Sequence, residues 1–250
     1  MAGMTNELKP DIPQRPPIAL VTGGSEGLGL ELVSSLADRG WCVITDARHG
    51  TRLRGAVAGL PGADRVTALP GDIADAGHRA ELTAEVDRLG GLDLLVLNAS
   101  TLGPLPMRPL RELTATELGE TIRGTAGANA ALMIELTDRL LARDGVVVGI
   151  SSDAAVEHYE TWGPYGAAKA ALDHLVQTFG AETGLAAYAV DPGDMRTRMH
   201  QDAFPDEDIS DRPLPETVAP RLLALVAQRP PTGRYRAADV ALPDRAEVPA

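Results

Sequence analysis

The chain has 250 residues and 44% hydrophobic content, which is enough for a substantial core in one large α/β domain or two small ones. Its net charge is −12 with scattered acidic residues, which argues against a nucleic-acid surface and favours a small-molecule substrate. The single cysteine, Cys42, excludes an intrachain disulfide and a multi-cysteine metal site, so we expect no metal and a cytoplasmic location. No apolar run reaches membrane-spanning length, so no membrane partner is expected.

Short apolar runs alternate with longer Ala/Leu-rich amphipathic stretches. The runs predict strands at Ile18–Val21, Cys42–Thr45, Val66–Leu69, Leu94–Leu97, Val146–Ile150 and Ala186–Val190, and Arg234–Val240 is a candidate last strand. The stretches predict helices that begin near Gly27, Thr51, Asp75, Thr116 and Pro164. Strict alternation indicates βαβ units, and the right-handed crossover rule then gives a doubly wound parallel α/β sheet with helices on both faces.

No internal repeat and no break in composition divides the chain. We expect residues 1–16 to form a flexible N-terminal tail and residues 17–250 to form a single domain. Residues 194–215 are irregular, acidic and Pro-containing, which predicts a mobile insertion that acts as a substrate lid.

A glycine-rich loop follows the first predicted strand, and an apolar-periodic helix follows the loop. The loop reads Thr22-Gly23-Gly24-Ser25-Glu26-Gly27-Leu28-Gly29. Glycines permit a tight turn and close backbone approach, while the helix N-terminus offers N–H groups and a positive dipole end to a pyrophosphate. The spacing differs from the G-x-G-x-x-G form, but the place between strand and helix favours a dinucleotide-binding loop.

Asp46 ends the second strand, where a carboxylate can accept hydrogen bonds from both adenosine ribose hydroxyls and repel a 2′-phosphate. Glu26 in the glycine loop adds to that repulsion. Alternatively, Asp46 is a turn residue and Arg48 binds a 2′-phosphate. The sequence therefore predicts NAD over NADP as the cofactor. Asp72, after the third strand, either lies along an adenine or caps the next helix.

Lysine is scarce, because Lys9 and Lys169 stand against 21 arginines among the 23 basic residues. A lysine in an Ala-rich helix of such a chain suggests chemistry that needs a compact, rotatable ammonium. Tyr165 lies four residues before Lys169, so the two share a helix face. A nearby cation favours phenolate, so we expect the pKa of Tyr165 to be lowered toward working pH, as suits a general acid and base.

Three motifs resemble the short-chain dehydrogenase/reductase family over nearly the whole chain. They are Thr22-Gly-x-x-x-Gly27-x-Gly29, Tyr165-x-x-x-Lys169 with Ser152 upstream, and Pro192-Gly193 followed by Thr197. The resemblance implies a single-domain Rossmann-type sheet of about seven strands. It also implies an NAD(P)-dependent oxidoreductase, an alcohol dehydrogenase or ketoreductase that transfers hydride between nicotinamide and a carbonyl or hydroxyl substrate.

The resemblance also assigns roles to single residues. Tyr165 would exchange a proton with the substrate oxygen, Ser152 would hydrogen-bond that oxygen, and Lys169 would bind the nicotinamide-ribose hydroxyls. Oriented donors beside a carbonyl stabilise the charge that hydride delivery builds on its oxygen. The expected cofactor-binding residues are Thr22, Gly23, Ser25, Glu26, Gly27, Leu28, Gly29, Asp46, Arg48, Asp72, Ile73, Asn98, Ala99, Ser100, Tyr165, Lys169, Pro192, Gly193 and Thr197.

Two positions depart from the family pattern. Asn98-Ala99-Ser100 follows Leu97 where the family usually has Asn-Asn-Ala-Gly, and Thr121 stands where a catalytic Asn is usual. In the family that Asn is thought to distort its helix and seat a water that links the lysine to solvent. Thr121 is shorter and lacks the amide, and Asn129 lies too far along the helix to replace it. These departures motivate an alternative, non-redox chemistry such as dehydration, isomerisation or cyclisation with a retained cofactor.

The expected substrate side is rich in aromatic residues. Three of the chain's eight aromatics fall within seven residues and, with His158 beside them, suggest a pocket for an apolar or ring-bearing substrate. Loop packing at a subunit contact explains the cluster equally well. The candidate substrate and lid residues are His158, Tyr159, Trp162, Met195, Met199, His200 and Phe204. Arg108 and Arg111 either steer an acidic substrate or are solvated. The resemblance implies a homodimer or homotetramer built on the helices Leu118–Leu141 and Pro164–Thr183.

Overall fold

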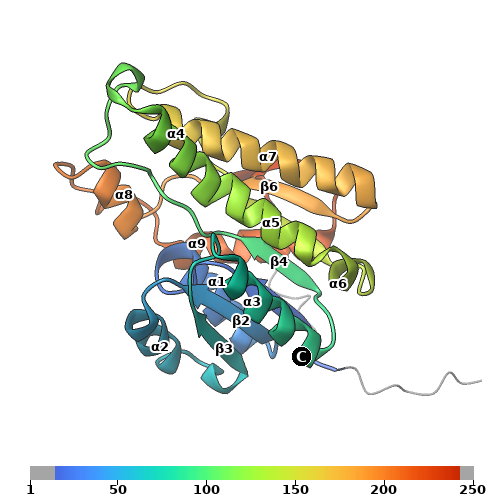
Figure 1. Ribbon diagram of the computed structural model, residues 1–250. Coiled ribbons are helices and arrows are strands. Elements are labelled where there is room, and N and C mark those ends of the chain that lie inside the picture. The colour runs from blue at the N-terminus through green and yellow to red at the C-terminus, as the bar shows by residue number, and fades with distance from the viewer. Residues whose placement is uncertain (1–14, 243–250) are drawn as a thin grey trace, which may run out of the picture.

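The computed structural model describes residues 15–242, which include a seven-stranded parallel sheet (Figure 1). Its strands are β1 (Ile18–Val21), β2 (Cys42–Ala47), β3 (Val66–Pro70), β4 (Leu94–Leu97), β5 (Val146–Ile150), β6 (Ala187–Asp191) and β7 (Gly233–Arg236). The strand order is β3-β2-β1-β4-β5-β6-β7. The predicted doubly wound parallel sheet is therefore confirmed. The expected tail lies almost entirely outside the described residues.

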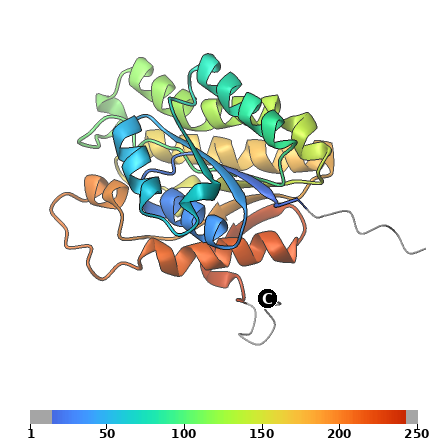
Figure 2. The same ribbon diagram turned by 90° about the horizontal axis from the view of Figure 1, so that it is seen from below.

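Helices cover both faces of this sheet. They are α1 (Gly27–Asp38), α2 (Gly50–Ala58), α3 (Ala76–Leu89), α4 (Ala115–Ile122), α5 (Ala128–Glu135), α6 (Thr137–Leu141), α7 (Gly163–Thr183), α8 (Arg198–Ala203) and α9 (Pro215–Gln228). Figure 2 shows α9 on the side of the sheet opposite to α7. Side-chain contacts place α1 and α9 on one face and α3, α5 and α7 on the other.

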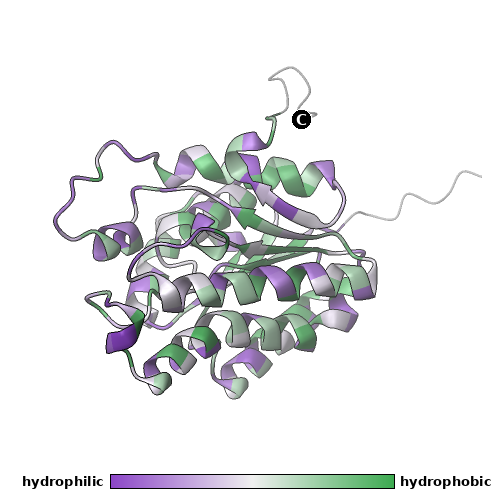
Figure 3. Cartoon of the chain, turned by 90° about the horizontal axis from the view of Figure 1, so that it is seen from above, coloured by the Kyte–Doolittle hydropathy of each residue, from purple (hydrophilic) through white to green (hydrophobic). Residues whose placement is uncertain are grey.

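The alternation of strand side chains explains this double coverage. In β1, Ala19 and Val21 pack toward α1 and α9, whereas Ile18 and Leu20 pack toward α3 and α5. Both sets are buried, because successive side chains of a strand point to opposite faces. A parallel sheet buried on both sides needs such continuous apolar runs, and this is why β1 and β4 read as uninterrupted hydrophobic segments. Figure 3 shows the strands and the inner helix faces as the hydrophobic parts of the molecule.

The predicted helix Leu118–Leu141 is wrong as a single element. After α4, residues Arg123–Gly127 form a π-helical turn, and α5 and α6 follow. Two glycines lie in the π-helical turn, where they lower the helix propensity. The break before α6 coincides with Thr137, whose hydroxyl donates to the carbonyls of Met133 and Ile134 and so competes with helix continuation. The apolar spacing of this segment is typical of one long helix and did not indicate either interruption.

Two other boundaries differ from the sequence prediction. The last strand is shorter than Arg234–Val240, because residues Ala237–Asp239 turn into a 3₁₀ helix. Residues 194–215 are not irregular throughout, since they contain α8, which Thr197 caps by accepting from the backbone N–H of His200 over 3.2 Å. The backbone N–H of Arg196 donates to the carbonyl of Pro213 over 2.8 Å, which ties the two ends of this insertion together.

Candidate active site

A cavity of about 720 Å³ opens at the carboxyl ends of the parallel strands. In doubly wound sheets, ligands bind at this edge, where the strand order reverses. Here the reversal lies between β1 and β4, and the segments that follow both strands line the cavity. Of the residues expected to bind cofactor, all except Thr22 line it.

Thr22 is fully buried and holds the loops that form the cavity. Its hydroxyl oxygen accepts from the backbone N–H groups of Asn98 and Ala99, each over 2.9 Å. Asn98 in turn donates from its side chain to the carbonyl of Thr22 over 2.8 Å. Asn129, also fully buried, donates to the carbonyl of Ala99 over 2.8 Å. The threonine therefore positions the β1 and β4 loops instead of lining the site.

The glycine loop leads directly into α1. Gly23 has a φ of +73°, a conformation that favours glycine, and Gly27 begins the helix. A Cβ on Gly29 would overlap the carbonyl oxygen of Gly23 and come within 2.5 Å of the Asn98 amide nitrogen. Only glycine therefore fits at position 29. The unpaired N–H groups of the first turn of α1 are suited to a phosphate group.

Asp46 lines the cavity as expected, but its carboxylate already has two hydrogen-bond partners. It is 2% exposed, and its carboxylate accepts from the backbone N–H of Gly23 over 2.9 Å and from His78 Nε2 over 3.2 Å. His78 is also buried, and the carboxylate of Asp46 raises the pKa of this histidine, with Glu81 adding to the effect. The carboxylate is therefore already bonded beneath the glycine loop.

At this end of the cavity, Arg48 has no ion-pair partner among the described residues, whereas the neighbouring Glu26 has one. Glu26 pairs with Arg52 over 3.2 Å, so the negative charge expected in the loop has a partner. Arg48 is exposed and lines the cavity, and within residues 15–242 it forms no ion pair. Asp72 lines the cavity and accepts from the backbone N–H of Ala74 over 2.9 Å. The N-cap of α3 is Asp75, so Asp72 does not cap this helix.

Ser152, Tyr165 and Lys169 meet on one wall of the cavity. Lys169 is 2% exposed, its ammonium donates to the carbonyl of Ile150 over 2.7 Å, and it lies 5.5 Å from the centre of the Tyr165 ring. Ser152 follows β5, and Tyr165 lies in the first turn of α7. Gly166 lets these two elements approach, since a Cβ there would come within 2.5 Å of the carbonyl oxygen of Ala154.

Burial controls the proton affinities of the tyrosine and the lysine. Burial raises the pKa of Tyr165 to about 12, and a hydrogen bond with Ser152 opposes this rise. Burial also lowers the pKa of Lys169 to about 8, although Asp173 favours its charged form. The expected lowering of the tyrosine pKa is therefore wrong for the protein without ligand. The physical reason is that loss of hydration penalises phenolate more than the distant ammonium stabilises it.

Thr121 holds a different position from the one expected of a catalytic residue. It is 2% exposed, its hydroxyl donates to the carbonyl of Glu117 over 2.9 Å, and it does not line the cavity. The π-helical turn of residues 123–127 begins two residues later. The distortion expected of this helix is thus present, although the asparagine is not.

Aromatic side chains surround Tyr165 on its other side. The Trp162 ring lies 5.4 Å from Tyr165 at 76° and 5.7 Å from Phe204 at 38°. Met195 and Met199 also line the cavity, as expected. His200 lines it too, whereas Phe204 does not. Tyr159 and His158 are exposed and do not line it either.

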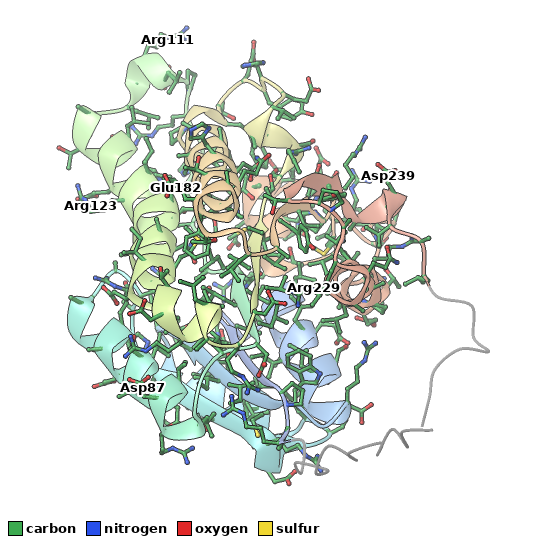
Figure 4. All side chains as sticks on the ribbon, turned by 90° about the vertical axis from the view of Figure 1, so that its right-hand side faces the viewer. Asp87, Arg111, Arg123, Glu182, Arg229 and Asp239 are labelled. Carbon is green, nitrogen blue, oxygen red and sulfur yellow. The ribbon has the colours of Figure 1, made fainter. Side chains whose placement is uncertain are left out.

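The basic residues considered for substrate steering are engaged elsewhere. Arg108 pairs with Glu117 over 2.5 Å, and Arg111 lies 3.6 Å from Glu112. Figure 4 shows Arg111 at the outer edge of the molecule. Neither arginine lines the cavity, which agrees with the solvated role considered for them.

Comparison with known proteins now identifies the family. The model of the short chain dehydrogenases matches residues 17–208. The chain is a short-chain dehydrogenase/reductase. It is 30% identical over 197 residues to dehydrogenase/reductase SDR family member 4 of Bos taurus, an alignment that covers 76% of this chain and 69% of the relative.

Solved structures of other short-chain dehydrogenases have the same fold. One from Shigella flexneri, complexed with NADP, has a TM-score of 0.82 at 27% identity and covers 89% of this chain and 97% of its own. One from Escherichia coli, complexed with NADPH, has a TM-score of 0.80 at 26% identity and covers 88% and 96%. Membership of this oxidoreductase family makes the chain an enzyme, and these likenesses support a nicotinamide nucleotide as its cofactor.

This short-chain dehydrogenase also has a buried charged network that the sequence did not reveal. Arg234 in β7 contacts Asp173 over 3.1 Å and Asp191 over 3.4 Å. Ser151, the residue before Ser152, donates to Asp173 over 2.6 Å. Sequence spacing correctly placed Ser152 in the cavity, but nothing in the sequence linked an arginine of the last strand to it.

The described part of this short-chain dehydrogenase has neither a metal-binding cluster nor a membrane-spanning helix. Within residues 15–242, no group of three or more His, Cys, Asp or Glu side chains is arranged to hold a metal ion. None of the helices in the same range is long and apolar enough to cross a membrane.

Proposed function

We propose that this enzyme interconverts a ketone and the corresponding secondary alcohol with a nicotinamide dinucleotide. One observation carries the proposal: the hydroxyls of Ser152 and Tyr165 lie beside the buried Lys169 in the same cavity as the glycine loop. A bound nicotinamide supplies or accepts the hydride. The glycine loop fits the pyrophosphate of such a cofactor, because it lines the cavity and leads into the N-terminus of α1, whose first N–H groups suit a phosphate.

The residues of this chain account for the proton side of the reaction. Tyr165 donates its phenolic proton to the carbonyl oxygen during reduction and receives it back during oxidation. Ser152 hydrogen-bonds the same oxygen and holds it in place. Lys169 binds ribose hydroxyls and supplies positive charge near the phenol.

Replacement of Tyr165 by Phe tests this assignment. It removes the proton donor and keeps the ring, so turnover falls by about a hundredfold or more, while NADPH still binds. Tyr235→Phe is the matched control, because that hydroxyl contacts the carbonyl of Pro231 far from the cavity. Cofactor absorbance with a panel of ketones gives the rate, and calorimetry gives the cofactor affinity.

Wild-type turnover in Tyr165→Phe would contradict the mechanism. Net consumption of NADPH by a ketone in the native enzyme would exclude the non-redox alternative.

We infer that the preferred cofactor is NADP and not the NAD expected from Asp46. The carboxylate of Asp46 is 2% exposed and already accepts from Gly23 and His78, which leaves less of it for ribose hydroxyls. Arg48 is exposed at the same end of the cavity with no ion partner among residues 15–242, and a 2′-phosphate is a suitable partner for it. Both solved relatives described above carry NADP or NADPH.

The ratio of kcat/KM for NADPH and NADH tests this preference. Arg48→Ser lowers the ratio about 10- to 100-fold, since a hydrogen bond between charged groups contributes about 1.5–3 kcal/mol. Arg54→Ser is the control. Arg54 lies in α2, which begins two residues after Arg48, and it is exposed but does not line the cavity. A native enzyme that favours NADH would overturn the inference.

We propose a homodimer that pairs through α5 and α7. Figure 1 shows these helices side by side, and Ile134, Leu141 and Leu175 are large apolar residues exposed in and beside them. Exposed apolar groups of this kind are typical of subunit contacts. Light scattering measures the mass, and Ile134→Glu would lower it to that of the monomer. A native monomer would contradict the proposal.

A further inference from the structure

The wall of the cavity beside Tyr165 is apolar and aromatic. Leu102, Ala154 and Tyr165 form a buried cluster, against which Trp162 and Ala203 pack. The Trp162 ring meets Tyr165 edge to face, and Phe204, the residue after α8, also contacts the indole. Such a wall favours a planar ring over a flexible chain, because aromatic rings gain both buried area and edge-to-face contact.

One polar atom in this wall has no partner. His200 in α8 lines the cavity, its side chain is 10% exposed, and its ring centre lies 4.9 Å from that of Phe204. The Nε2 atom is buried and has no hydrogen-bond partner within the described part of the chain. A buried polar group without a partner costs free energy, so a ligand that satisfies it gains affinity.

The surroundings of His200 indicate which ligand group would satisfy Nε2. Its Nδ1 lies 3.8 Å from the carboxylate of Asp194, which can only accept hydrogen bonds. At 3.8 Å this contact is longer than a hydrogen bond. Nε2 is an acceptor in one tautomer of the imidazole and a donor in the other. A hydroxyl group serves both tautomers, because it donates to the first and accepts from the second.

We propose that the substrate is an aromatic ketone with a hydroxyl group near its carbonyl, or the diol formed from it. The ring lies against Trp162, the carbonyl oxygen meets Ser152 and Tyr165, and the hydroxyl bonds to His200 Nε2. This proposal rests on the proposed ketone reduction at the same site. His200 is a binding residue in it, and the proton and hydride steps are those already described.

Four ketones separate the two recognition elements. Phenacyl alcohol has both ring and hydroxyl, acetophenone has the ring alone, hydroxyacetone has the hydroxyl alone, and cyclohexyl methyl ketone has a saturated ring. We expect kcat/KM for phenacyl alcohol to exceed that for acetophenone about five- to tenfold, as one hydrogen bond provides. The kcat/KM for acetophenone exceeds that for cyclohexyl methyl ketone, and the value for hydroxyacetone is the lowest of the four. Equal values for phenacyl alcohol and acetophenone in the native enzyme would overturn the proposal.

Variants at His200 assign the hydroxyl preference. His200→Phe keeps a ring against Phe204 and removes Nε2, so the ratio of phenacyl alcohol to acetophenone falls toward one, mainly through KM. His200→Gln restores a polar nitrogen and recovers part of the ratio. His174→Phe, at an exposed position of α7, leaves the ratio unchanged. An unchanged ratio in His200→Phe would contradict the role of His200.

A binding measurement separates this proposal from the proposed function. The chain has two tryptophans, so Trp41→Phe leaves Trp162 as the only indole, and its fluorescence reports the wall directly. Phenacyl alcohol is titrated with NADP⁺ present, which prevents reduction. Saturable quenching that weakens in His200→Phe supports the subsite even if no ketone oxidises NADPH. Ketone reduction with neither ring nor hydroxyl preference would reject the subsite and keep the function.

Discussion

Arg234 Nη2 donates to the backbone carbonyl of Ser152 over 2.9 Å. The same guanidinium contacts the carboxylates of Asp173 in α7 and Asp191 at the end of β6. It therefore joins the last strand to three elements that carry the site: the catalytic serine, the helix of Tyr165 and Lys169, and the turn before Gly193. A planar guanidinium with several donors suits this junction better than an ammonium.

Replacement of Arg234 by Gln leaves two buried carboxylates without their cation. Breaking a buried ion pair from one side costs about 3 kcal/mol, so we expect a loss of that order in the free energy of unfolding. Urea denaturation measures it. Arg236→Gln is the control, since Arg236 lies in the same strand but is exposed, and its cost should be small. Equal stability of the two variants would show that the network contributes nothing.

The pH dependence of the reaction follows from two shifted groups. Burial raises the pKa of Tyr165 to about 12, so the proton donor for ketone reduction stays protonated well into alkaline solution. Burial lowers the pKa of Lys169 to about 8, so its charge is lost as pH rises through that value. We expect kcat/KM for reduction to be flat below pH 8 and to fall above it.

Alcohol oxidation behaves in the opposite way, because it needs a deprotonated phenol and speeds up as pH rises. Lys169→Met should remove the fall near pH 8 from the residual reduction rate. A reduction profile that stays flat through pH 10, well past this pKa, would contradict the assignment of the charge to Lys169.

The pair of His78 and Asp46 makes stability depend on pH. The Asp46 carboxylate raises the pKa of His78 above its ordinary value of 6.5. The histidine therefore holds its proton more tightly in the folded state, and the resulting stabilisation is complete below pH 6.5. It is lost as pH rises through the folded-state pKa. His78→Gln lacks this term, so its deficit in unfolding free energy should be larger in acid than in alkali. A deficit independent of pH would show that the pair is not charged.

A methyl group at Gly29 should disrupt the glycine loop. Gly29→Ala places a Cβ against the carbonyl oxygen of Gly23 and the amide of Asn98, and such overpacking costs about 1–3 kcal/mol. Cofactor affinity falls with it, as calorimetry would detect. Gly55→Ala in α2 is the matched control, because a Cβ there meets nothing within 4 Å. In this control variant the free energy of unfolding should rise by about 0.5–1 kcal/mol, because alanine has a higher helix propensity than glycine.

The sheet and the catalytic wall could be predicted because their signals are local. Apolar runs marked the first six strands, and the spacing of Tyr165 and Lys169 placed both on one helix face. Asp46 was placed correctly at the end of β2, but the sequence did not show that its carboxylate already has two partners. The partner that occupies it, His78, lies 32 residues later in α3, and no local pattern connects them.

The tyrosine pKa was misjudged for a related reason. Sequence spacing shows that a cation is near the phenol, but it does not show how completely both groups are buried. The loss of hydration outweighs an ammonium that donates instead to the carbonyl of Ile150. Arg234 was missed because a contact between the last strand and the serine loop depends on the full sheet order.

The scarcity of lysine gives the protein a practical property. Lys169 is the only lysine between residues 15 and 242, so an amine label recovered from that region reports a single atom. That atom is buried in the wall that binds substrate and cofactor in our proposal, and its lowered pKa makes the neutral, nucleophilic amine accessible near pH 8. The rate at which Lys169 is labelled would therefore measure how often the cavity opens. Protection of Lys169 by a dinucleotide would measure how fully the dinucleotide occupies the cavity, without any turnover.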